Sequence, residues 1–446
     1  MNTTRRNFLK MSAAALAAVH VLGDERADRK FTTALVGSGW WGMNILNEAM
    51  ASGQCKVVGV CDVDARFLNP ATDKVAKLTG DQPRKYTDFR ELLAKEKPEI
   101  AIVATPDHWH ALMTIAALKN GAHAYVEKPI AHTIREGRAM VKAARETGKV
   151  VQVGTHRRVS PHNLSGREFI RSGKAGKIGF VRAFIQYGGG PERPRRNVEP
   201  PKEIDWDMWC GPAPLRPYNG GPGNPWGSIH PKGFRNYLDY ANGTLGDWGI
   251  HWMDQILWVM DCEKWPRKVF STGGRPIKGP PVLTKDEQTS DAPDSQSAVY
   301  EFENFTLTWE HRMFAANNHE KTESVGCYFY GTEGVFHMGW QQGWTFFPAD
   351  EDEQKVHVNP QLHQPDDQNI KELWADFLDA IKHNRKPVSD IEDVYYSTNL
   401  SLLGMLSYKL RRSLAWDGKK EECVGDPEAN KLLSRVYRKP WVYPEG

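Results

Sequence analysis

Short continuous apolar runs alternate with amphipathic segments in the first third of the chain. The runs that predict strands cover residues 30–37, 56–61, 100–104, 123–126 and 150–153. Apolar positions at helical spacing predict helices over residues 41–51, 70–78, 87–94, 108–119 and 133–147. Buried strands that alternate with helices are typical of a parallel sheet with helices on both faces and right-handed crossovers. This part of the chain therefore predicts an α/β domain.

The pattern after residue 156 is less regular. Alternating apolar and polar positions at 180–186, 297–303, 306–309 and 325–330 predict strands of an antiparallel sheet. Residues 247–260, 372–383 and 395–414 are expected to be helical. Residues 187–240 are too rich in Gly, Pro and aromatic residues for regular structure. A long ordered loop in a compact enzyme usually lines a site or an interface, so we expect that role for this segment.

The first residues resemble an export signal. Residues 3–10 read TTRRNFLK and precede an apolar run, 11–23, that is well short of the ~20 residues a membrane span needs. Paired arginines before such a run resemble a twin-arginine signal, so we expect residues 1–28 to direct the protein to the periplasm or otherwise out of the cytoplasm. A chance amphipathic start is the alternative. Because no small-residue cleavage motif precedes Asp24, retention as an anchor stays open, and we expect no transmembrane span in the mature protein.

Composition narrows the function classes. The 446 residues include 58 Lys plus Arg and 55 Asp plus Glu, a net charge of +3, so no basic excess points to nucleic acid. An aromatic content of 11% argues against disorder as the main state. The length allows two or three domains. None of the six cysteines stands in a C-x-x-C or zinc-type spacing, which predicts mostly buried free thiols and leaves one disulfide open.

The first turn between a strand and a helix carries a glycine motif. Its residues are Gly37, Ser38, Gly39, Trp40, Trp41 and Gly42. The Gly-x-Gly-x-x-Gly spacing after a strand and before a helix is the dinucleotide-binding pattern, in which the helix N-terminus meets the pyrophosphate. Asp62 ends the next strand, where a carboxylate accepts hydrogen bonds from the adenosine ribose. Its charge would repel a 2′-phosphate, so NAD is expected rather than NADP. A glycine turn without a cofactor is the alternative.

Polar residues follow the later strands of the predicted sheet. Open α/β sheets bind ligands outside the carboxyl ends of their strands, so we expect these residues to contact the cofactor. They are Thr105, Pro106, His108 and His110, then Glu127 and Lys128, and finally His156 and Arg157. Position alone leaves Lys128 either a surface cation or a group of the active site.

Several motifs together resemble one protein family. They are GSGWWG (37–42), TPDHWH (105–110), EKP (127–129), WDMWCGPAP (206–214), GTLGDWGIHWMD (243–254) and VGDPEANKLLSRVYRKPW (424–441). In this order they resemble the Gfo/Idh/MocA oxidoreductases, and more closely the exported branch that carries twin-arginine signals in carbohydrate-degrading bacteria. The resemblance implies an NAD-binding Rossmann domain, 29–155, and an α+β domain, 156–446, with a large open, mostly antiparallel sheet and C-terminal helices able to pack back on the first domain. It also implies a homo-oligomer, a dimer or a tetramer, built through that sheet.

The same resemblance assigns catalytic residues. In the family the E-K-P lysine lies beside nicotinamide and substrate, and a D-x-x-x-H pair completes the site, which implies Lys128, Asp247 and His251. On a helix, residues four apart share one face, so Asp247 would fix the tautomer of His251. The alternative is a helix cap at Asp247 and a satisfied core histidine. Further substrate contacts are expected from His156, Arg157, His230, Arg235 and Tyr240.

Three functions compete at this point. The leading one is hydride transfer between nicotinamide and a hydroxyl-bearing carbon of a sugar, glycoside or cyclic polyol, with an imidazole as base and an ammonium opposite the alkoxide. The second is a glycosidase-like enzyme whose tightly held NAD oxidises the sugar transiently and permits elimination. The N-acetylgalactosaminidases that do this have Val where this chain has Lys128. The third is a binding protein without catalysis.

Two further expectations concern bound groups. The twin-arginine route moves folded proteins, often with the cofactor inserted, so we expect NAD to be tightly bound. His156, His230, His251 and His311 show no ligand spacing in sequence, and no metal is expected.

Overall fold

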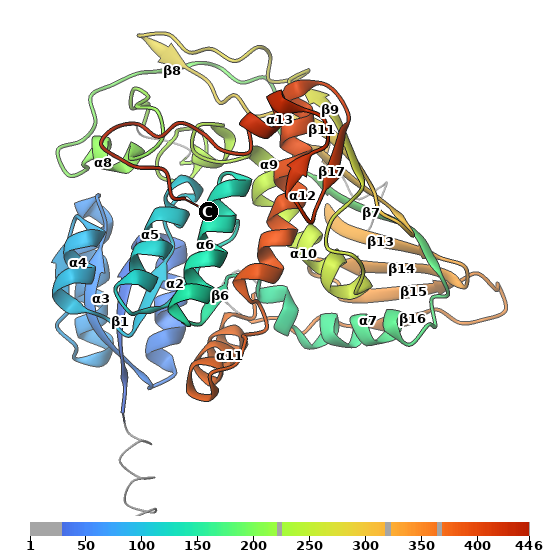
Figure 1. Ribbon diagram of the computed structural model, residues 1–446, viewed down its shortest axis with the longest axis horizontal. Coiled ribbons are helices and arrows are strands. Elements are labelled where there is room, and N and C mark those ends of the chain that lie inside the picture. The colour runs from blue at the N-terminus through green and yellow to red at the C-terminus, as the bar shows by residue number, and fades with distance from the viewer. Residues whose placement is uncertain (1–28, 221–224, 317–322, 364–367, 446) are drawn as a thin grey trace, which may run out of the picture.

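The computed structural model describes residues 29–220, 225–316, 323–363 and 368–445 (Figure 1). The segment expected to be the export signal, 1–28, lies outside these ranges. None of the described helices has both the length and the hydrophobicity that crossing a membrane would require.

The N-terminal domain is a doubly wound α/β fold. Its strands are β1 (Phe31–Val36), β2 (Cys55–Cys61), β3 (Arg84–Tyr86), β4 (Ile100–Val103), β5 (His123–Val126) and β6 (Val151–Val153). Its helices are α2 (Trp40–Ala51), α3 (Ala65–Thr79), α4 (Phe89–Glu96), α5 (Asp107–Lys119) and α6 (Ile134–Thr147). All strand pairs are parallel, in the order β3-β2-β1-β4-β5-β6. The predicted Rossmann sheet is confirmed. Its strand order reverses between β1 and β4, and such folds bind dinucleotides at this point.

Two details of this domain differ from the expectation. Helix α3 begins at Ala65 rather than at residue 70, because the Asp64 side chain accepts a hydrogen bond from the backbone N–H of Arg66 at 2.9 Å and caps the helix. Pro70 lies inside this helix. Strand β3 was not expected, since only one of its three residues is buried and its sequence carries almost no apolar signal.

The second domain is built on a broad, mostly antiparallel sheet. Among the described residues ten strands form it, in the order β16-β15-β14-β13-β7-β12-β11-β9-β17-β18, and only β7 and β12 pair in parallel. The strands are β7 (Ile178–Gln186), β9 (Lys268–Gly274), β11 (Ser295–Glu301), β12 (Thr306–Arg312), β13 (Val325–Gly331), β14 (Gly334–Gly339), β15 (Trp344–Pro348), β16 (Val356–Val358), β17 (Leu414–Asp417) and β18 (Glu422–Cys423). The predicted fold class is confirmed.

One face of this sheet is covered by helices. Helix α7 (Pro161–Arg171) packs against β14 and β15, α12 (Ile391–Leu410) packs against β9, and α10 (Gly249–Met260) contacts both helices (Figure 1). In β11 the residues alternate strictly between buried and more exposed positions, as a sheet with one covered face requires. Helix α11 (Ile370–His383) and α12 also contact the first domain, through α2 and α6 respectively.

Two expected helices of the second domain have different ends. The helix expected over 247–260 is divided into α9 (Gly243–Asp247) and α10, with Trp248 between them. Helix α12 begins after Asp390, whose side chain caps it, and ends before Arg411, which adopts φ 54°. Leu414, the last residue of the expected helix, instead begins strand β17.

The long segment 187–240 lies across the carboxyl edge of the Rossmann sheet. Its described residues form only short elements, β8 (Arg195–Arg196), α8 (Trp206–Cys210) and the 3-10 turn η2 (Gly233–Asn236) (Figure 1). The backbone N–H of Ala65 donates to the carbonyl of Glu203 at 2.8 Å, and that of Asp205 donates to Val63 at 2.9 Å. The segment is therefore joined to the β2–α3 connection by backbone hydrogen bonds.

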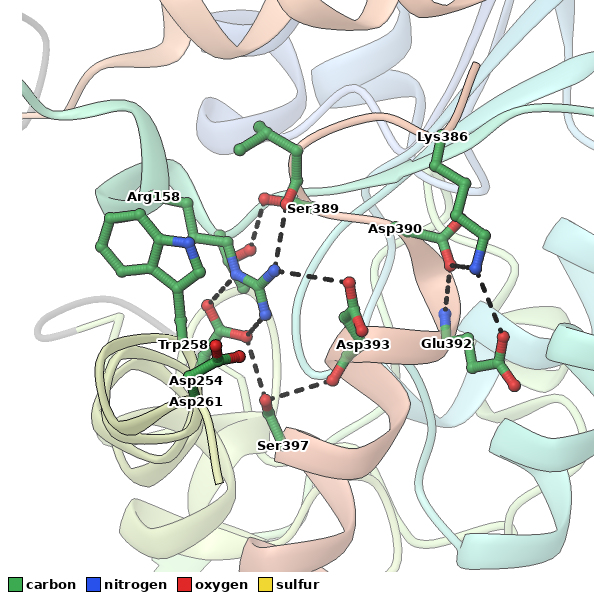
Figure 2. Close-up of polar contacts among 12 residues, drawn as sticks. Arg158, Asp254, Trp258, Asp261, Lys386, Ser389, Asp390, Glu392, Asp393 and Ser397 are labelled. Carbon is green, nitrogen blue, oxygen red and sulfur yellow. Dashed lines mark hydrogen bonds and ion pairs between the residues drawn. The ribbon is translucent and has the colours of Figure 1, made fainter. Parts of the chain in front are cut away.

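A buried ion pair fixes α10 against the segment that follows β6 and against α12 (Figure 2). The guanidinium of Arg158, just after β6, donates to both carboxylate oxygens of Asp254 at 2.7 and 2.8 Å. Ser397 of α12 donates to the same carboxylate at 3.0 Å. Because His251 lies one turn before Asp254 on α10, this network helps to fix the position of the histidine relative to the segment that follows β6.

The cysteines are unpaired. All six lie within the described ranges, none forms a disulfide, and all but Cys262 are buried. The expectation of mostly buried free thiols is confirmed.

Candidate active site

A cavity of about 870 Å³ lies between the two domains. Its volume is in the range of small-molecule and cofactor sites. From the first domain, the expected site residues that line it are Gly37, Gly39, Trp40, Trp41, Gly42, Asp62, Thr105, Pro106, Glu127 and Lys128. From the second domain they are His230, Arg235, Asp247 and His251. Both predicted halves of the site therefore face one cavity.

The glycine turn has the geometry of a phosphate cradle. Gly37 adopts φ 92°, and a Cβ on Gly42 would lie 2.0 Å from the carbonyl oxygen of Gly37, so both positions require glycine. A Cβ on Gly39 would meet nothing within 4 Å. Gly39 is the N-cap of α2, without a side-chain cap and without an acidic residue in the first turn. The first N–H groups of α2 are thus available to an anion, and these residues fit the pyrophosphate of a dinucleotide.

Asp62 is held at the edge of the same turn. Its carboxylate accepts hydrogen bonds from the backbone N–H and the hydroxyl of Ser38 at 2.7 and 3.0 Å. Burial raises the pKa of this carboxyl, while these hydrogen bonds oppose the rise. Ser38 is itself buried and does not line the cavity, so its part is to orient Asp62 rather than to touch a ligand directly.

Lys128 and Asp247 lie at the end of the cavity opposite the glycine turn. The Lys128 ammonium donates to the Asp247 carboxylate at 2.7 Å and to the Asp247 carbonyl at 3.0 Å. Arg235 donates to the same carboxylate oxygen at 3.2 Å. Burial alone would raise the pKa of Asp247, but the two cations hold it well below its usual range. Asp247 therefore stays ionised and fixes the ammonium at the cavity wall.

His251 completes this end of the cavity. Burial, together with the nearby charge of Lys128, holds the pKa of His251 well below its usual range, so its ring is neutral near pH 7. The rings of Trp248 and Trp340 pack around it, with centroids 5.7 and 5.0 Å away. A neutral imidazole among apolar rings can accept a proton from a bound hydroxyl.

The expected hydrogen bond between Asp247 and His251 is not formed among the described residues. Asp247 ends α9 and His251 lies in α10, so the two residues do not share one continuous helix. The carboxylate instead accepts from Lys128 and Arg235. The prediction that Asp247 orients the imidazole directly is wrong in this structure.

Three expected ligand contacts lie away from the cavity. His108 bonds the carbonyl of Trp209 at 2.9 Å, His110 bonds the carbonyls of Thr105 and Pro129, each at 2.7 Å, and Tyr240 donates to the carbonyl of Pro214 at 2.9 Å. All three side chains are almost fully buried. Burial lowers the pKa of His108 to about 3 and that of His110 to about 4. Their predicted contacts with cofactor or substrate are therefore corrected to structural roles, since each side chain bonds backbone carbonyls of the protein.

Of the other predicted residues, His230 lines the cavity, whereas His156 and Arg157 do not. His156 is buried, 3.8 Å from the Glu127 carboxylate, and does not line the cavity. Arg157, which also does not line it, stacks on Trp340 with 3.7 Å from its guanidinium carbon to the ring centroid. His230 lines the cavity and lies 2.8 Å from the carboxylate of Asp64, near the Asp62 end. The predicted contacts of His156 and Arg157 are therefore indirect in this structure.

Asp107 is a titratable residue of the cavity that the sequence did not lead us to expect. Asp107, the first residue of α5, lines the cavity, and its Oδ2 is buried without a hydrogen-bond partner in the described part of the chain. Burial and the neighbouring Asp247 raise its pKa to about 7. Burial likewise raises the pKa of Glu127 to about 7. Asp107 belongs to the TPDHWH motif, so the sequence could have indicated it. The site roles were assigned to the two histidines of that motif instead.

Two family profiles match the chain. The profile of the Gfo/Idh/MocA oxidoreductase family, NAD-binding Rossmann fold, matches residues 31–155. The profile of the same oxidoreductase family's C-terminal alpha/beta domain matches residues 175–443. Together they cover both domains that meet at the cavity.

The chain also resembles individual proteins, at low sequence identity and over part of their length. A glycosyl hydrolase family 109 protein from Shewanella baltica OS155 is 26% identical over 204 residues, which are 40% of this chain and 44% of that protein. The chain thus spans less than half the length of the curated relative it matches.

Solved structures share the fold. The WlbA dehydrogenase from Bordetella pertussis, solved with NADH and UDP-GlcNAcA, superposes with a TM-score of 0.61 at 16% identity and covers 87% of this chain and 99% of that one. Levoglucosan dehydrogenase, solved with NADH and L-sorbose, gives a TM-score of 0.64 at 17% identity and covers 86% and 98%.

Proposed function

Because the chain belongs to the Gfo/Idh/MocA oxidoreductase family, we propose that it transfers a hydride between nicotinamide and a hydroxyl-bearing carbon of a sugar, glycoside or cyclic polyol. One observation carries the proposal: a single cavity has the glycine cradle and Asp62 at one end and Lys128, Asp247 and His251 at the other. The sugar-like ligands of the structural neighbours support the substrate class.

The first domain binds and orients the dinucleotide. The N–H groups of the first turn of α2 meet the pyrophosphate, and Asp62 accepts hydrogen bonds from the adenosine ribose hydroxyls. The negative charge of Asp62 disfavours a 2′-phosphate, so the cofactor proposed is NAD rather than NADP. When bound, the nicotinamide accepts or donates the hydride.

The residues of the opposite end handle the proton. Neutral His251 takes the proton of the substrate hydroxyl as the hydride leaves the carbon that bears this hydroxyl. The Lys128 ammonium, fixed by Asp247 at 2.7 Å, stabilises the charge that develops on that oxygen. The rings of Trp248 and Trp340 exclude water from His251. This strengthens the proton transfer to His251 and the stabilisation of the oxygen's charge by Lys128.

A second candidate is transient oxidation followed by elimination of an aglycone. The relatives named glycosyl hydrolase family 109 favour it. The cavity also contains two further carboxyl groups, Asp107 and Glu127, with pKa values near 7 that suit a proton donor to a leaving group. The resembling N-acetylgalactosaminidases have Val where this chain has Lys128. This difference favours net oxidation or reduction of the substrate over transient oxidation followed by elimination.

The cellular setting is proposed on separate grounds. The arginine pair before the apolar run at 11–23 supports export, which requires that the cofactor travel with the folded protein. The uncovered face of the broad sheet supports a homo-oligomer, because Phe180, Phe270, Val299 and Phe347 on it are 36 to 44% exposed. Size-exclusion chromatography with light scattering measures this state.

The test is a panel of glycosides, free sugars and cyclic polyols incubated with the full chain. Mass spectrometry of the products and the nicotinamide absorbance are followed together. We expect a keto product with one substrate class, and a fall in kcat of about 10²- to 10³-fold in Lys128→Met. Lys77→Met, an exposed lysine on α3, is the matched control. Full activity in both Lys128→Met and His251→Ala contradicts the assigned roles, and aglycone release without a net keto product supports the second candidate.

A further inference from the structure

A cation of the second domain lies at the glycine turn of the first. The Lys232 ammonium is 4.4 Å from the ring centroid of Trp40, the first residue of α2, and 5.1 Å from that of Trp226. All three side chains line the cavity. Two indole faces thus hold one ammonium beside the N-terminus of the helix that forms the phosphate cradle.

Lys232 forms no ion pair with a carboxylate in the described part of the chain. Among the described residues no carboxylate lies within ion-pair distance of it, whereas Lys128 and Arg235 both bind Asp247. The first turn of α2 contains no acidic residue either. Two sources of positive potential, the helix N-terminus and the ammonium, therefore meet at one place in the cavity, and no carboxylate in the described part of the chain pairs with the ammonium.

The turn that presents Lys232 is anchored to the first domain. Its backbone N–H donates to the carbonyl of Pro225 at 3.3 Å, and a Cβ on the next residue, Gly233, would lie 2.1 Å from the carbonyl oxygen of Ser228. Two residues earlier, His230 lies 2.8 Å from the Asp64 carboxylate. A close turn, tied to the β2–α3 connection, therefore holds the ammonium beside the N-terminus of α2.

We propose that Lys232 binds the pyrophosphate of the dinucleotide from the second-domain side and sets how slowly the cofactor leaves. This rests on the proposed function, since it assumes that a dinucleotide occupies the cavity. The α2 N–H groups bind the phosphate oxygens on one side, and the ammonium adds a charge-assisted hydrogen bond on the other. Because the two contacts come from different domains, release of the cofactor breaks both.

The test compares cofactor retention in the full chain and its variants. Lys232→Ala and Lys232→Gln remove the charge, Lys232→Arg keeps it, and Lys202→Ala removes an exposed lysine of the same segment. NAD released per chain on denaturation is measured, as is the dissociation rate of NADH from nicotinamide fluorescence excited through tryptophan. We expect dissociation about ten- to a hundredfold faster in Lys232→Ala and Lys232→Gln, and rates near wild type in the other two.

The outcomes separate this inference from the proposed function. A wild-type chain that neither carries nor binds a dinucleotide contradicts both. Unchanged NAD content and NADH dissociation in a folded Lys232→Ala or Lys232→Gln overturn the role of Lys232 alone. The same is true if only the KM for an acidic sugar rises while NADH dissociation stays constant, because the anion bound by Lys232 then belongs to the substrate.

Discussion

Two carboxyl groups of the cavity titrate in opposite directions. Lys128 and Arg235 hold the pKa of Asp247 well below its usual range against the effect of burial, whereas burial and the charge of Asp247 raise the pKa of Asp107 to about 7. Environments that push the pKa values of neighbouring acids apart are typical of acid and base roles within one site. Near neutral pH, Asp247 is the fixed anion and Asp107 is the carboxyl that can carry a proton.

Asp107 also makes stability depend on pH. Between pH 4 and 7 the folded state keeps a proton that the unfolded chain has lost, so the contribution of Asp107 to folding stability falls as the pH rises through this window. Asp107→Asn removes that cost, and we expect it to stabilise the chain by about 1 to 3 kcal/mol at pH 8 and by little at pH 4. Thermal unfolding across this range measures the difference. Asp73→Asn, at an exposed position of α3, is the control, and an effect of Asp107→Asn that is equal at both pH values refutes the assignment.

The sequence predicted which residues form the site but not how they contact one another. Lys128, Asp247 and His251 were found because motifs mark them, and all three line the cavity. That Lys128 pairs with Asp247, 119 residues away, could not be derived from spacing. His108 and His110 were misplaced because sequence shows which residue types a loop contains but not which side of helix α5 the next domain covers.

At the scale of elements, two glycines of the turn before α2 have different roles: Gly42 is needed for packing and Gly39 for binding the cofactor. A Cβ at Gly42 would lie 2.0 Å from the Gly37 carbonyl, whereas a Cβ at Gly39 would enter open space. We expect Gly42→Ala to cost about 1 to 3 kcal/mol of folding stability because the turn must shift. Gly39→Ala should leave stability nearly unchanged and weaken NAD binding, because its methyl group enters the cradle. Urea unfolding and calorimetric titration with NAD measure the two effects, and equal stability losses in both variants contradict this division.

The ion pair that holds α10 makes a second prediction at this scale. Arg158→Ala leaves the Asp254 carboxylate, which is fully buried, with Ser397 as its remaining side-chain donor (Figure 2). We expect a loss of about 3 to 5 kcal/mol in urea unfolding. The double variant Arg158→Met, Asp254→Leu should lose much less, because no buried charge remains. A double variant as unstable as Arg158→Ala would show that packing rather than the unpaired charge determines the cost.

Elements with strong apolar patterns were predictable, and those decided by local capping were not. The strands β1, β2, β4, β5 and β6 lie within about a residue or two of their expected ranges. The break at Trp248 divides what the sequence presents as one helical stretch, and α12 is displaced by four residues at both ends because Asp390 caps it and Arg411 ends it. Such ends depend on one or two residues, whereas strand positions depend on runs of apolar side chains.

At the scale of the whole molecule, function depends on how the two domains meet. The segment 187–240 was expected to line a site, and it contributes His230, Lys232 and Arg235 to the cavity. Which of its side chains face the cavity was not predictable, because the backbone contacts that place it, such as Ala65 to Glu203, join residues far apart in the chain. Long-range pairing of this kind is set by packing rather than by local pattern.

A crystal structure of the full chain with NAD bound would test how the cofactor lies in the cavity. We expect the pyrophosphate at the N-terminus of α2 beside Lys232, the adenosine ribose at Asp62, and the nicotinamide ring against Lys128 and His251. A dinucleotide bound in the opposite direction, or one whose nicotinamide lies away from Lys128, would contradict this expectation.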